Sequence, residues 1–300
     1  MYHYFCALGV LLAVSAAVMS APDSSQTVRK SHRLESNIVY VTRGSVPVKL
    51  DLYLPTAESK TPRPAVMLFH GGAWTSGVKE EVGWIAAWLA DQGYVVAAPS
   101  YRLAPEHKHP AQIEDCKRAV RWVRRNAKKY NIDPKRIAAM GFSAGAHLSA
   151  MLGVGKDLEY LAGDKNDVSA KVQAVIGVSG PYVLAPPPGQ KAGAGLPDLS
   201  YWLGGTAAEK LKVYQEVSPA YHVTRYTPPF LLIAGNADML TPTYLDAVMA
   251  AKLREKGVPV ETILVKNTGH VLIPVPDKQI EPSLPEIQKK ALDFIRKHLR

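Results

Sequence analysis

A serine lies between two glycines at residues 141–145, which read G-F-S-A-G. The pattern G-x-S-x-G is typical of a sharp turn between a strand and a helix, which presents its serine hydroxyl as a nucleophile. Glycine is needed at both ends because a Cβ atom there would collide with the neighbouring strand or helix. The turn also leaves the N–H of Ala144 unpaired at a helix start, where it can stabilise a developing negative charge. Ser143 is therefore the candidate nucleophile, and Ala144 is a candidate oxyanion donor.

A nucleophilic serine needs a base and an acid. His270 lies in a loop between an apolar run at residues 260–265 and the last helical segment. Asp238 directly follows the apolar run at residues 229–234 and precedes His270 in the chain. Loops after parallel strands meet at the carboxyl edge of the sheet, and serine, acid, histidine is the chain order of this architecture. We therefore expect Asp238 to orient the imidazole of His270, which acts on Ser143.

Other histidines and one other carboxylate are rivals for these roles. Asp246 also lies between the serine and His270, but it falls within a predicted helix, where we expect it to face water. The rival histidines lie in an irregular segment, a proline-bounded loop, the N-terminal leader and the last helix: His222, His107, His109, His32 and His298.

The sequence H-G-G-A-W at residues 70–74 follows an apolar run at residues 65–69. This is the loop position that supplies oxyanion donors in the same architecture, and glycines let backbone N–H groups approach a substrate oxygen. We assign the N–H groups of Gly72 and Ala73 to an oxyanion hole, together with that of Ala144. Losing one such donor typically costs on the order of 3 kcal/mol of transition-state stabilisation.

Metal and nucleotide motifs are absent from the sequence. It contains neither H-E-x-x-H nor a cysteine cluster, and neither G-x-G-x-x-G nor a phosphate-binding loop. We therefore expect no metal and no cofactor.

Strand and helix patterns alternate from residue 65 onward, which predicts an α/β fold with a mostly parallel central sheet flanked by helices. An antiparallel strand pair precedes it, at residues 37–43 and 46–54, and the second strand alternates as a half-exposed strand should. The further strands are expected at residues 65–69, 94–98, 136–140, 171–178, 229–234 and 260–265. The helices are expected at residues 78–91, 110–130, 144–152, 242–256 and 284–299.

Residues 181–226 interrupt this alternation. They are rich in proline and glycine, and tryptophan and tyrosine are interleaved among them. A long irregular insertion before a core strand is uncommon unless it has a function. We expect a lid or acyl-binding cap here, with a loosely packed surface excursion as the alternative.

The N-terminus has the pattern of a secretory signal peptide. An apolar run at residues 5–18 is too short to span a membrane comfortably, and Val18-Met19-Ser20 fits a cleavage site. We expect a signal peptide at residues 1–20, a flexible leader at 21–36 and one domain at 37–300, in a secreted or periplasmic protein. An uncleaved membrane anchor is the alternative. Cleavage would leave Cys116 as the one cysteine, so no internal disulfide forms.

The chain of 300 residues is 47% hydrophobic and carries a formal net charge of +10. Much of the positive charge lies between residues 117 and 136, largely on one face of a predicted helix. We expect this face to be solvated, and contact with an acidic polymer or surface is the alternative. We expect no nucleic-acid partner and no stable membrane insertion after cleavage, and the oligomeric state is open.

From residue 37 to the C-terminus, these features resemble the α/β-hydrolase superfamily. The motifs at residues 70–74 and 101–106, H-G-G-A-W and Y-R-L-A-P-E, look like those of hormone-sensitive-lipase-like esterases. The motifs at residues 109–115 and 132–137, H-P-A-Q-I-E-D and I-D-P-K-R-I, are similar to the bacterial acetylxylan and feruloyl esterase-like (BD-FAE-type) branch.

The resemblance implies a serine carboxylesterase in which Ser143 is the nucleophile, His270 the general base and acid, and Asp238 the orienting carboxylate. Ala73 departs from the pattern, because many lipase-like members have a third glycine there, but its N–H is retained.

The sequence thus predicts a secreted serine hydrolase of carboxylic esters that acts through an acyl-enzyme. Short acyl esters are the expected substrates, including acetyl or feruloyl esters on polysaccharide. One alternative is a peptidase or amidase of the same fold, which would need a group to capture a peptide amine. The other is a non-catalytic carbohydrate-binding protein of this fold, although serine, acid and histidine all occur in order.

Overall fold

The computed structural model describes residues 31–155, 168–186, 189 and 198–300. The predicted signal peptide and residues 21–30 of the predicted leader lie outside the described residues, as does part of the predicted cap.

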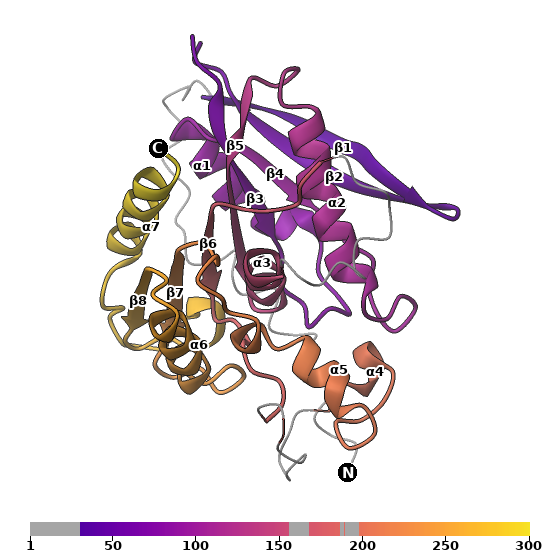
Figure 1. Cartoon of the computed structure of the whole chain (residues 1–300). Coiled ribbons are helices and arrows are strands. Elements are labelled where there is room, and N and C mark those ends of the chain that lie inside the picture. Colours follow the sequence, from indigo (N-terminus) through magenta and orange to yellow (C-terminus); the bar gives the residue numbers. More distant parts are fainter. Residues whose placement is uncertain (1–30, 156–167, 187–188, 190–197) are drawn as a thin grey trace. The chain divides into compact units, whose positions relative to one another are not determined.

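The fold is built on an eight-stranded sheet with the order β1-β2-β4-β3-β5-β6-β7-β8 (Figure 1). The pairs β1–β2 and β2–β4 are antiparallel, and the pairs from β4 to β8 are parallel, so the predicted α/β class is confirmed. The strands are β1 His32–Arg43, β2 Val46–Pro55, β3 Arg63–Phe69, β4 Val95–Pro99, β5 Ile132–Phe142, β6 Ala174–Val178, β7 Phe230–Gly235 and β8 Val260–Val265.

Helices cover both faces of the sheet. Buried side chains of α1 and α7 pack on one face, and those of α2, α3 and α6 pack on the other (Figure 1). The α-helices are α1 Gly83–Asp91, α2 Ala111–Arg125, α3 Ala144–Val154, α4 Ser200–Leu203, α5 Leu211–Glu216, α6 Tyr244–Glu255 and α7 Leu284–His298. The 3-10 turns are η1 Lys79–Val82, η3 Pro219–Tyr221 and η4 His270–Leu272.

Burial on both faces explains the apolar runs of the central strands, since β6 and β7 are buried along their whole length. The second strand differs from its predicted half-exposed pattern, because alternation in β2 stops at Leu50 and every residue from there to Leu54 is buried. Asp51 is tolerated in this buried stretch because it pairs with the buried Lys79 ammonium at 3.0 Å.

The first strand begins earlier than predicted. Residues 32–36, which the sequence placed in the flexible leader, belong to β1 and pair with β2 from His32 opposite Pro55. The His32 ring lies 2.7 Å from an Asp91 oxygen, and the N–H of Thr56 donates to the Ser31 carbonyl. These contacts fix a polar segment whose composition alone predicts no order.

The basic segment between residues 117 and 136 is solvated only in part, because Arg125, Lys128, Lys129 and Lys135 are exposed. Lys117, Arg118 and Arg121 on α2 are buried. The Arg118 guanidinium pairs with Glu114 and Asp115, and Arg121 Nε donates to the Val168 carbonyl at 3.0 Å. These three long side chains reach into the fold, so this part of the charge serves packing between α2 and its neighbours. Helix α2 also ends at Arg125, five residues before its predicted end.

The described part of residues 181–226, called the cap below, carries α4, α5 and η3, and Figure 1 shows α4 and α5 beside each other. Trp202 and Tyr214 are 1% and 0% exposed and join the same core cluster as α2 and α3. Such burial disfavours the loosely packed excursion for this part of the chain. None of the helices in the described ranges has the length and apolar character that a membrane span requires.

Candidate active site

Ser143 lies at the junction of β5 and α3 with φ 52° and ψ −119°. An L-residue rarely adopts this conformation, and the surrounding structure must hold it. A Cβ atom on Gly141 would collide with the backbone of Gly145, and one on Gly145 would collide with the carbonyl of Phe69 at the end of β3. The glycine spacing is therefore what allows β5, α3 and β3 to meet around the serine.

Backbone hydrogen bonds hold the serine turn on both sides. The Ser143 N–H donates to the Val178 carbonyl at the end of β6, at 2.9 Å. The His147 N–H donates to the Ser143 carbonyl at 3.1 Å and begins the hydrogen-bond ladder of α3. The hydroxyl is thereby presented at the carboxyl edge of the sheet.

The structure brings the three predicted side chains together. His270 Nε2 lies 2.8 Å from Ser143 Oγ, and His270 Nδ1 lies 2.9 Å from Asp238 Oδ2. An ionised carboxylate only accepts hydrogen bonds, so Nδ1 carries the imidazole proton. Nε2 is then the acceptor that faces the serine hydroxyl. This arrangement can deprotonate Ser143 as its oxygen attacks an electrophilic carbon.

Asp238 is 5% exposed, and its surroundings keep it ionised. Burial alone would raise its pKa, but hydrogen bonds from His270 and from the N–H and hydroxyl of Thr241 outweigh burial and lower the pKa to about 2. The N–H groups of Leu240 and Thr241 both donate to Oδ1, at 2.9 and 2.8 Å. A fixed negative charge therefore faces the imidazole at neutral pH.

The loops that carry Asp238 and His270 approach each other closely because of Gly235 at the end of β7. A Cβ atom on Gly235 would collide with the carbonyls of Thr268 and Gly269. The Ala237 N–H donates to the Thr268 carbonyl at 2.9 Å. The distance between acid and histidine is thus set by backbone contacts between the loops.

The predicted oxyanion loop lies against the serine turn. A Cβ atom on Gly71 would lie 3.3 Å from Ser143 Cβ. The next residues, Gly72, Ala73 and Trp74, all have positive φ, at 103°, 50° and 63°. The Gly72 carbonyl accepts hydrogen bonds from the backbone N–H groups of the two residues after Trp74, at 3.0 and 2.9 Å, which closes a tight turn.

The N–H groups predicted to form the oxyanion hole are available. Within the described ranges, no hydrogen-bond acceptor is found for the N–H groups of Gly72, Ala73 or Ala144. Gly72 and Ala73 come from the loop after β3, and Ala144 comes from the start of α3. Unpaired N–H groups beside a nucleophile can stabilise an oxyanion.

His70 at the start of this loop serves packing. Its ring is 1% exposed and stacks on Tyr101, with centroids 4.3 Å apart. Burial lowers the pKa of His70 to about 4, although a hydrogen bond with the Gly71 carbonyl opposes the shift. The Tyr101 hydroxyl donates to the His70 carbonyl at 3.0 Å. A neutral ring therefore anchors the base of the loop.

The rival histidines lie elsewhere and have other neighbours. Their neighbours are the Glu216 carbonyl for His222, Glu106 for His107, Trp202 for His109, Asp91 for His32 and Phe294 for His298.

Asp246 corrects a prediction. It lies on α6 as expected but is 7% exposed and does not face water. Burial, assisted by the charge of Asp238, raises the pKa of Asp246 to about 7. It interacts electrostatically with the buried phenol of Tyr182, whose pKa is raised chiefly by burial.

Two residues that the sequence motifs did not predict, Thr241 and Ser179, support the site. Thr241 Oγ1 lies 2.8 Å from Asp238 Oδ2 and 3.2 Å from His270 Nδ1. Ser179 Oγ accepts from the N–H of Val271 at 3.0 Å, which holds the residue after the histidine. Aspartate often accepts from the backbone two residues on, as Asp238 does from the Leu240 N–H, and this turn propensity is the one local signal near Thr241. Ser179 has no comparable local signal.

In the described ranges, no three His, Cys, Asp or Glu side chains are grouped so that they could hold a metal ion. The chemistry available at this site comes from the serine, the imidazole, the carboxylate and the backbone donors.

Three comparisons bear on this geometry. The family model BD-FAE matches residues 50–253. The esterase LipC of Mycobacterium tuberculosis is 33% identical over 208 residues, which are 68% of this chain and 52% of LipC. The chain spans about half the length of the curated relatives that it matches.

Solved structures are similar over nearly the whole chain. A truncated carbohydrate esterase from gut microbiota superposes with a TM-score of 0.77 at 27% identity, covering 90% of this chain and 98% of that one. Esterase 2 of Thermogutta terrifontis, phosphoramylated by tabun, has a TM-score of 0.72 at 26% identity and covers 89% of this chain and 94% of that one.

Proposed function

The chain belongs to the BD-FAE family and has the α/β-hydrolase fold, and from this premise we propose that it is a serine hydrolase of carboxylic esters. The observation that carries the proposal is the continuous array in which His270 lies 2.8 Å from Ser143 Oγ and 2.9 Å from Asp238. The covalent modification of the Thermogutta esterase by tabun supports a nucleophilic mechanism, because a nucleophile must attack the phosphorus.

In the acylation step, Ser143 Oγ attacks the ester carbonyl carbon while its proton passes to His270 Nε2. The carbonyl electron pair moves to oxygen, and the oxyanion is held by the N–H groups of Gly72, Ala73 and Ala144. Collapse of this intermediate breaks the bond to the alcohol oxygen, which takes the proton from the imidazolium. The product is an alcohol and an acyl group bound to Ser143.

In the deacylation step, water attacks the acyl carbonyl and gives its proton to His270 Nε2. A second oxyanion forms in the same place, and its collapse returns the proton to Ser143 Oγ and releases the acid. Asp238 stabilises the imidazolium in both steps, because its carboxylate stays ionised beside Nδ1.

We propose short acyl esters as substrates, including acetyl or feruloyl esters attached to polysaccharide. The likeness to a carbohydrate esterase supports this class of substrate. We also propose that the protein is exported and that residues 1–20 are removed as a signal peptide, on the sequence pattern given above. Identification of the mature N-terminus by mass spectrometry tests the export proposal.

Hydrolysis of p-nitrophenyl acetate, butyrate and decanoate by the wild-type protein and by Ser143→Ala tests the central proposal. We expect activity that falls as the acyl chain lengthens and that is lost in Ser143→Ala. Ser149→Ala is a matched control, because Ser149 is a buried serine on α3, the helix that begins directly after Ser143, and its hydroxyl has no partner among the described residues. A folded wild-type protein that cleaves none of these esters, or that cleaves aminoacyl p-nitroanilides faster, would overturn it.

A further inference from the structure

The oxyanion loop is joined to the cap by a pair of stacked tryptophans. The ring of Trp74, the residue after Ala73, stacks on Trp202 of α4 with centroids 3.8 Å apart and planes 6° apart. Trp74 is 3% exposed and Trp202 is 1% exposed. The contact therefore buries both rings and links two segments that are 128 residues apart in the chain.

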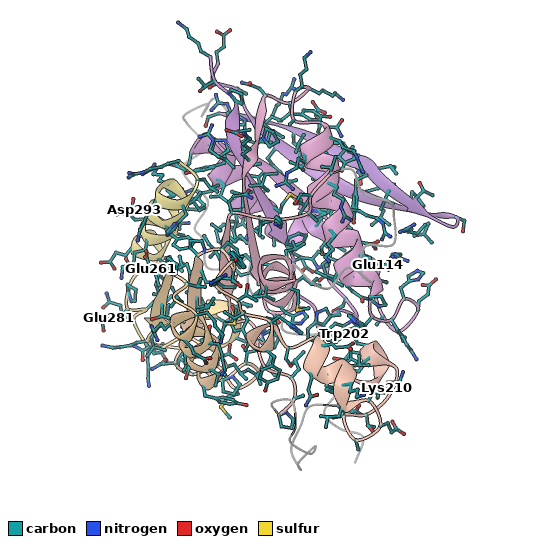
Figure 2. The ribbon with its side chains drawn as sticks, in the orientation of Figure 1. Glu114, Trp202, Lys210, Glu261, Glu281 and Asp293 are labelled. Carbon is teal, nitrogen blue, oxygen red and sulfur yellow. The ribbon has the colours of Figure 1, made fainter. Side chains whose placement is uncertain are left out.

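Trp202 is itself held in a fixed orientation. Its Nε1 donates to Gln112 Oε1 on α2 at 3.0 Å, and its carbonyl accepts from the His109 N–H at 3.0 Å. The His109 ring meets the Trp202 ring edge-on, at 5.8 Å and 86°. Figure 2 labels Trp202 where the helices of the cap meet the α/β core. Trp202 is thus held through its indole N–H, its ring and its carbonyl, so it can hold the Trp74 ring in place.

The same cluster reaches the helix that begins at the serine. His147 on α3 meets Trp74 edge-on at 5.1 Å and 88°, and meets Trp202 at 5.5 Å and 89°. Its Nε2 lies 2.6 Å from the carbonyl of Val217, at the end of α5 in the cap. The oxyanion loop, the nucleophile helix and the cap therefore meet in one aromatic cluster: Trp74, His109, His147 and Trp202.

The loop needs such support because three successive residues, Gly72, Ala73 and Trp74, have positive φ. Residues other than glycine persist in this region only where the surroundings over-determine it. Ala73 has a methyl side chain and little capacity to anchor itself, whereas Trp74 offers a large ring.

We propose that Trp202 is a positioning residue for the oxyanion hole. By clamping Trp74, it holds the N–H groups of Gly72 and Ala73 toward the carbonyl oxygen of the substrate on Ser143. The cap thereby contributes to catalysis from a distance, without contacting the reacting atoms. This inference rests on the proposed esterase function and adds a residue to it.

Kinetics separate positioning from simple packing. The assay uses p-nitrophenyl acetate at a temperature well below the melting temperature of Trp202→Ala. In this variant we expect kcat to fall about tenfold or more, while KM changes less than about threefold. The effect falls on kcat because misplaced N–H donors weaken stabilisation of the transition state. Trp202→Phe keeps a ring against Trp74 and should recover most of kcat. A Trp202→Ala variant with kcat within threefold of the wild type would overturn the proposal.

Tyr214→Ala is the matched control, because it removes another fully buried cap ring, and among the described residues this ring makes no ring contact with Trp74. We expect Tyr214→Ala to lower the melting temperature as much as Trp202→Ala does, but to keep kcat within threefold of the wild type. An equal fall in kcat would mean that general loosening of the cap is responsible and would overturn the specific role of Trp202.

A double-mutant cycle tests the route through Trp74. If Trp202 acts through that ring, adding Trp202→Ala to Trp74→Ala should lower kcat no further. Additive losses would contradict this route.

Hydrogen exchange gives a readout that does not need activity. Amides in the peptide covering residues 70–76 should exchange faster in Trp202→Ala than in the wild type and in Tyr214→Ala. If the wild-type protein hydrolyses no ester, the proposed function fails, while the exchange still tests the clamp. If the protein is active and exchange in this peptide is unchanged, the clamp alone fails.

Discussion

At the scale of single residues, the environment of Asp238 decides what the imidazole can do. Oδ2 faces both His270 Nδ1 and Thr241 Oγ1, and Oδ1 accepts two backbone N–H groups. Every contact to this carboxylate is a donor, which favours the ionised form and lowers the pKa to about 2. The tautomer with Nδ1–H, which leaves Nε2 free to accept the serine proton, is therefore set by groups that never touch substrate.

Asp238→Asn should remove this control with little change in shape. The amide NH₂ can face Nδ1 and force the opposite tautomer, with the proton on Nε2 pointing at Ser143 Oγ. We expect kcat to fall about 10⁴-fold, as in a serine protease whose triad aspartate is replaced by asparagine, and the melting temperature to stay within a few degrees. Steady-state hydrolysis of p-nitrophenyl acetate measures the loss. Asp246→Asn makes the same chemical change eight residues later and should retain activity, and a loss below a hundredfold in Asp238→Asn would contradict the role of the carboxylate.

At the scale of secondary-structure elements, the site depends on two strand ends that lie so close to a neighbouring helix or loop that only glycine fits at the contact. Gly145 lets α3 approach the end of β3, and Gly235 lets the loop after β8 approach the end of β7. Both contacts are between backbone atoms, which cannot move aside as the end of a flexible side chain can. The precision of the site is thus a property of how the elements meet.

Gly235→Ala tests this at a distance from the reacting atoms. Its Cβ would displace the loop that carries His270, and a shift of about 1 Å in a reacting group can cost about a hundredfold in rate. We expect kcat to fall by about that factor. Gly83→Ala is the control. Its Cβ would meet the Tyr53 hydroxyl, which is the end of a side chain and not backbone, so this variant should keep its activity. Equal activity of Gly235→Ala and wild type would show that the close contact at Gly235 does not set the position of His270.

Asp246 makes helix α6 sensitive to pH. Its pKa is raised to about 7 in the fold by burial, from an ordinary value near 3.8, and it interacts electrostatically with the Asp238 carboxylate and the Tyr182 phenol. An acid whose pKa is higher in the folded than in the unfolded state contributes fully to stability below its unfolded pKa. This contribution is lost as the pH rises through its folded pKa. Stability should therefore decline from about pH 4 to above pH 7. In Asp246→Asn this part of the decline should vanish, with a higher melting temperature than the wild type at pH 8. Parallel pH profiles of the two proteins would contradict the assignment.

At the scale of the whole molecule, the sequence predicts what local patterns encode. Alternating apolar runs predicted the α/β fold correctly, and the serine motif with its following acid and histidine named side chains that the structure brings together. Burial arising from distant packing was not predictable in the same way. Arg121 donates to the Val168 carbonyl 47 residues away, Asp246 lies inside the fold, and Trp202 stacks on Trp74, which lies 128 residues earlier. The sequence assigned Arg121 and Asp246 to solvent, because no local pattern indicates that they are buried.

The N-terminal boundary gives a test at this scale. The sheet order places β1 at one edge, remote from the strands that carry Ser143, Asp238 and His270. Deleting residues 1–30 should leave activity and melting temperature unchanged, since Ser31 to Arg300 form one unit with its own contacts. Deleting residues 1–36 also removes the His32–Asp91 pair, the Thr56 to Ser31 hydrogen bond and the first pairs with β2.

Each lost hydrogen bond contributes about 1 kcal/mol, so the longer deletion should lower the melting temperature by several degrees. Its activity at low temperature should persist, because none of the lost contacts reaches the site. Calorimetry and ester hydrolysis on the two deletions measure both effects. Equal melting temperatures would mean that residues 32–36 are the leader their composition predicts. A loss of activity in the longer deletion at a temperature where it remains folded would show that the sheet edge and the site are coupled.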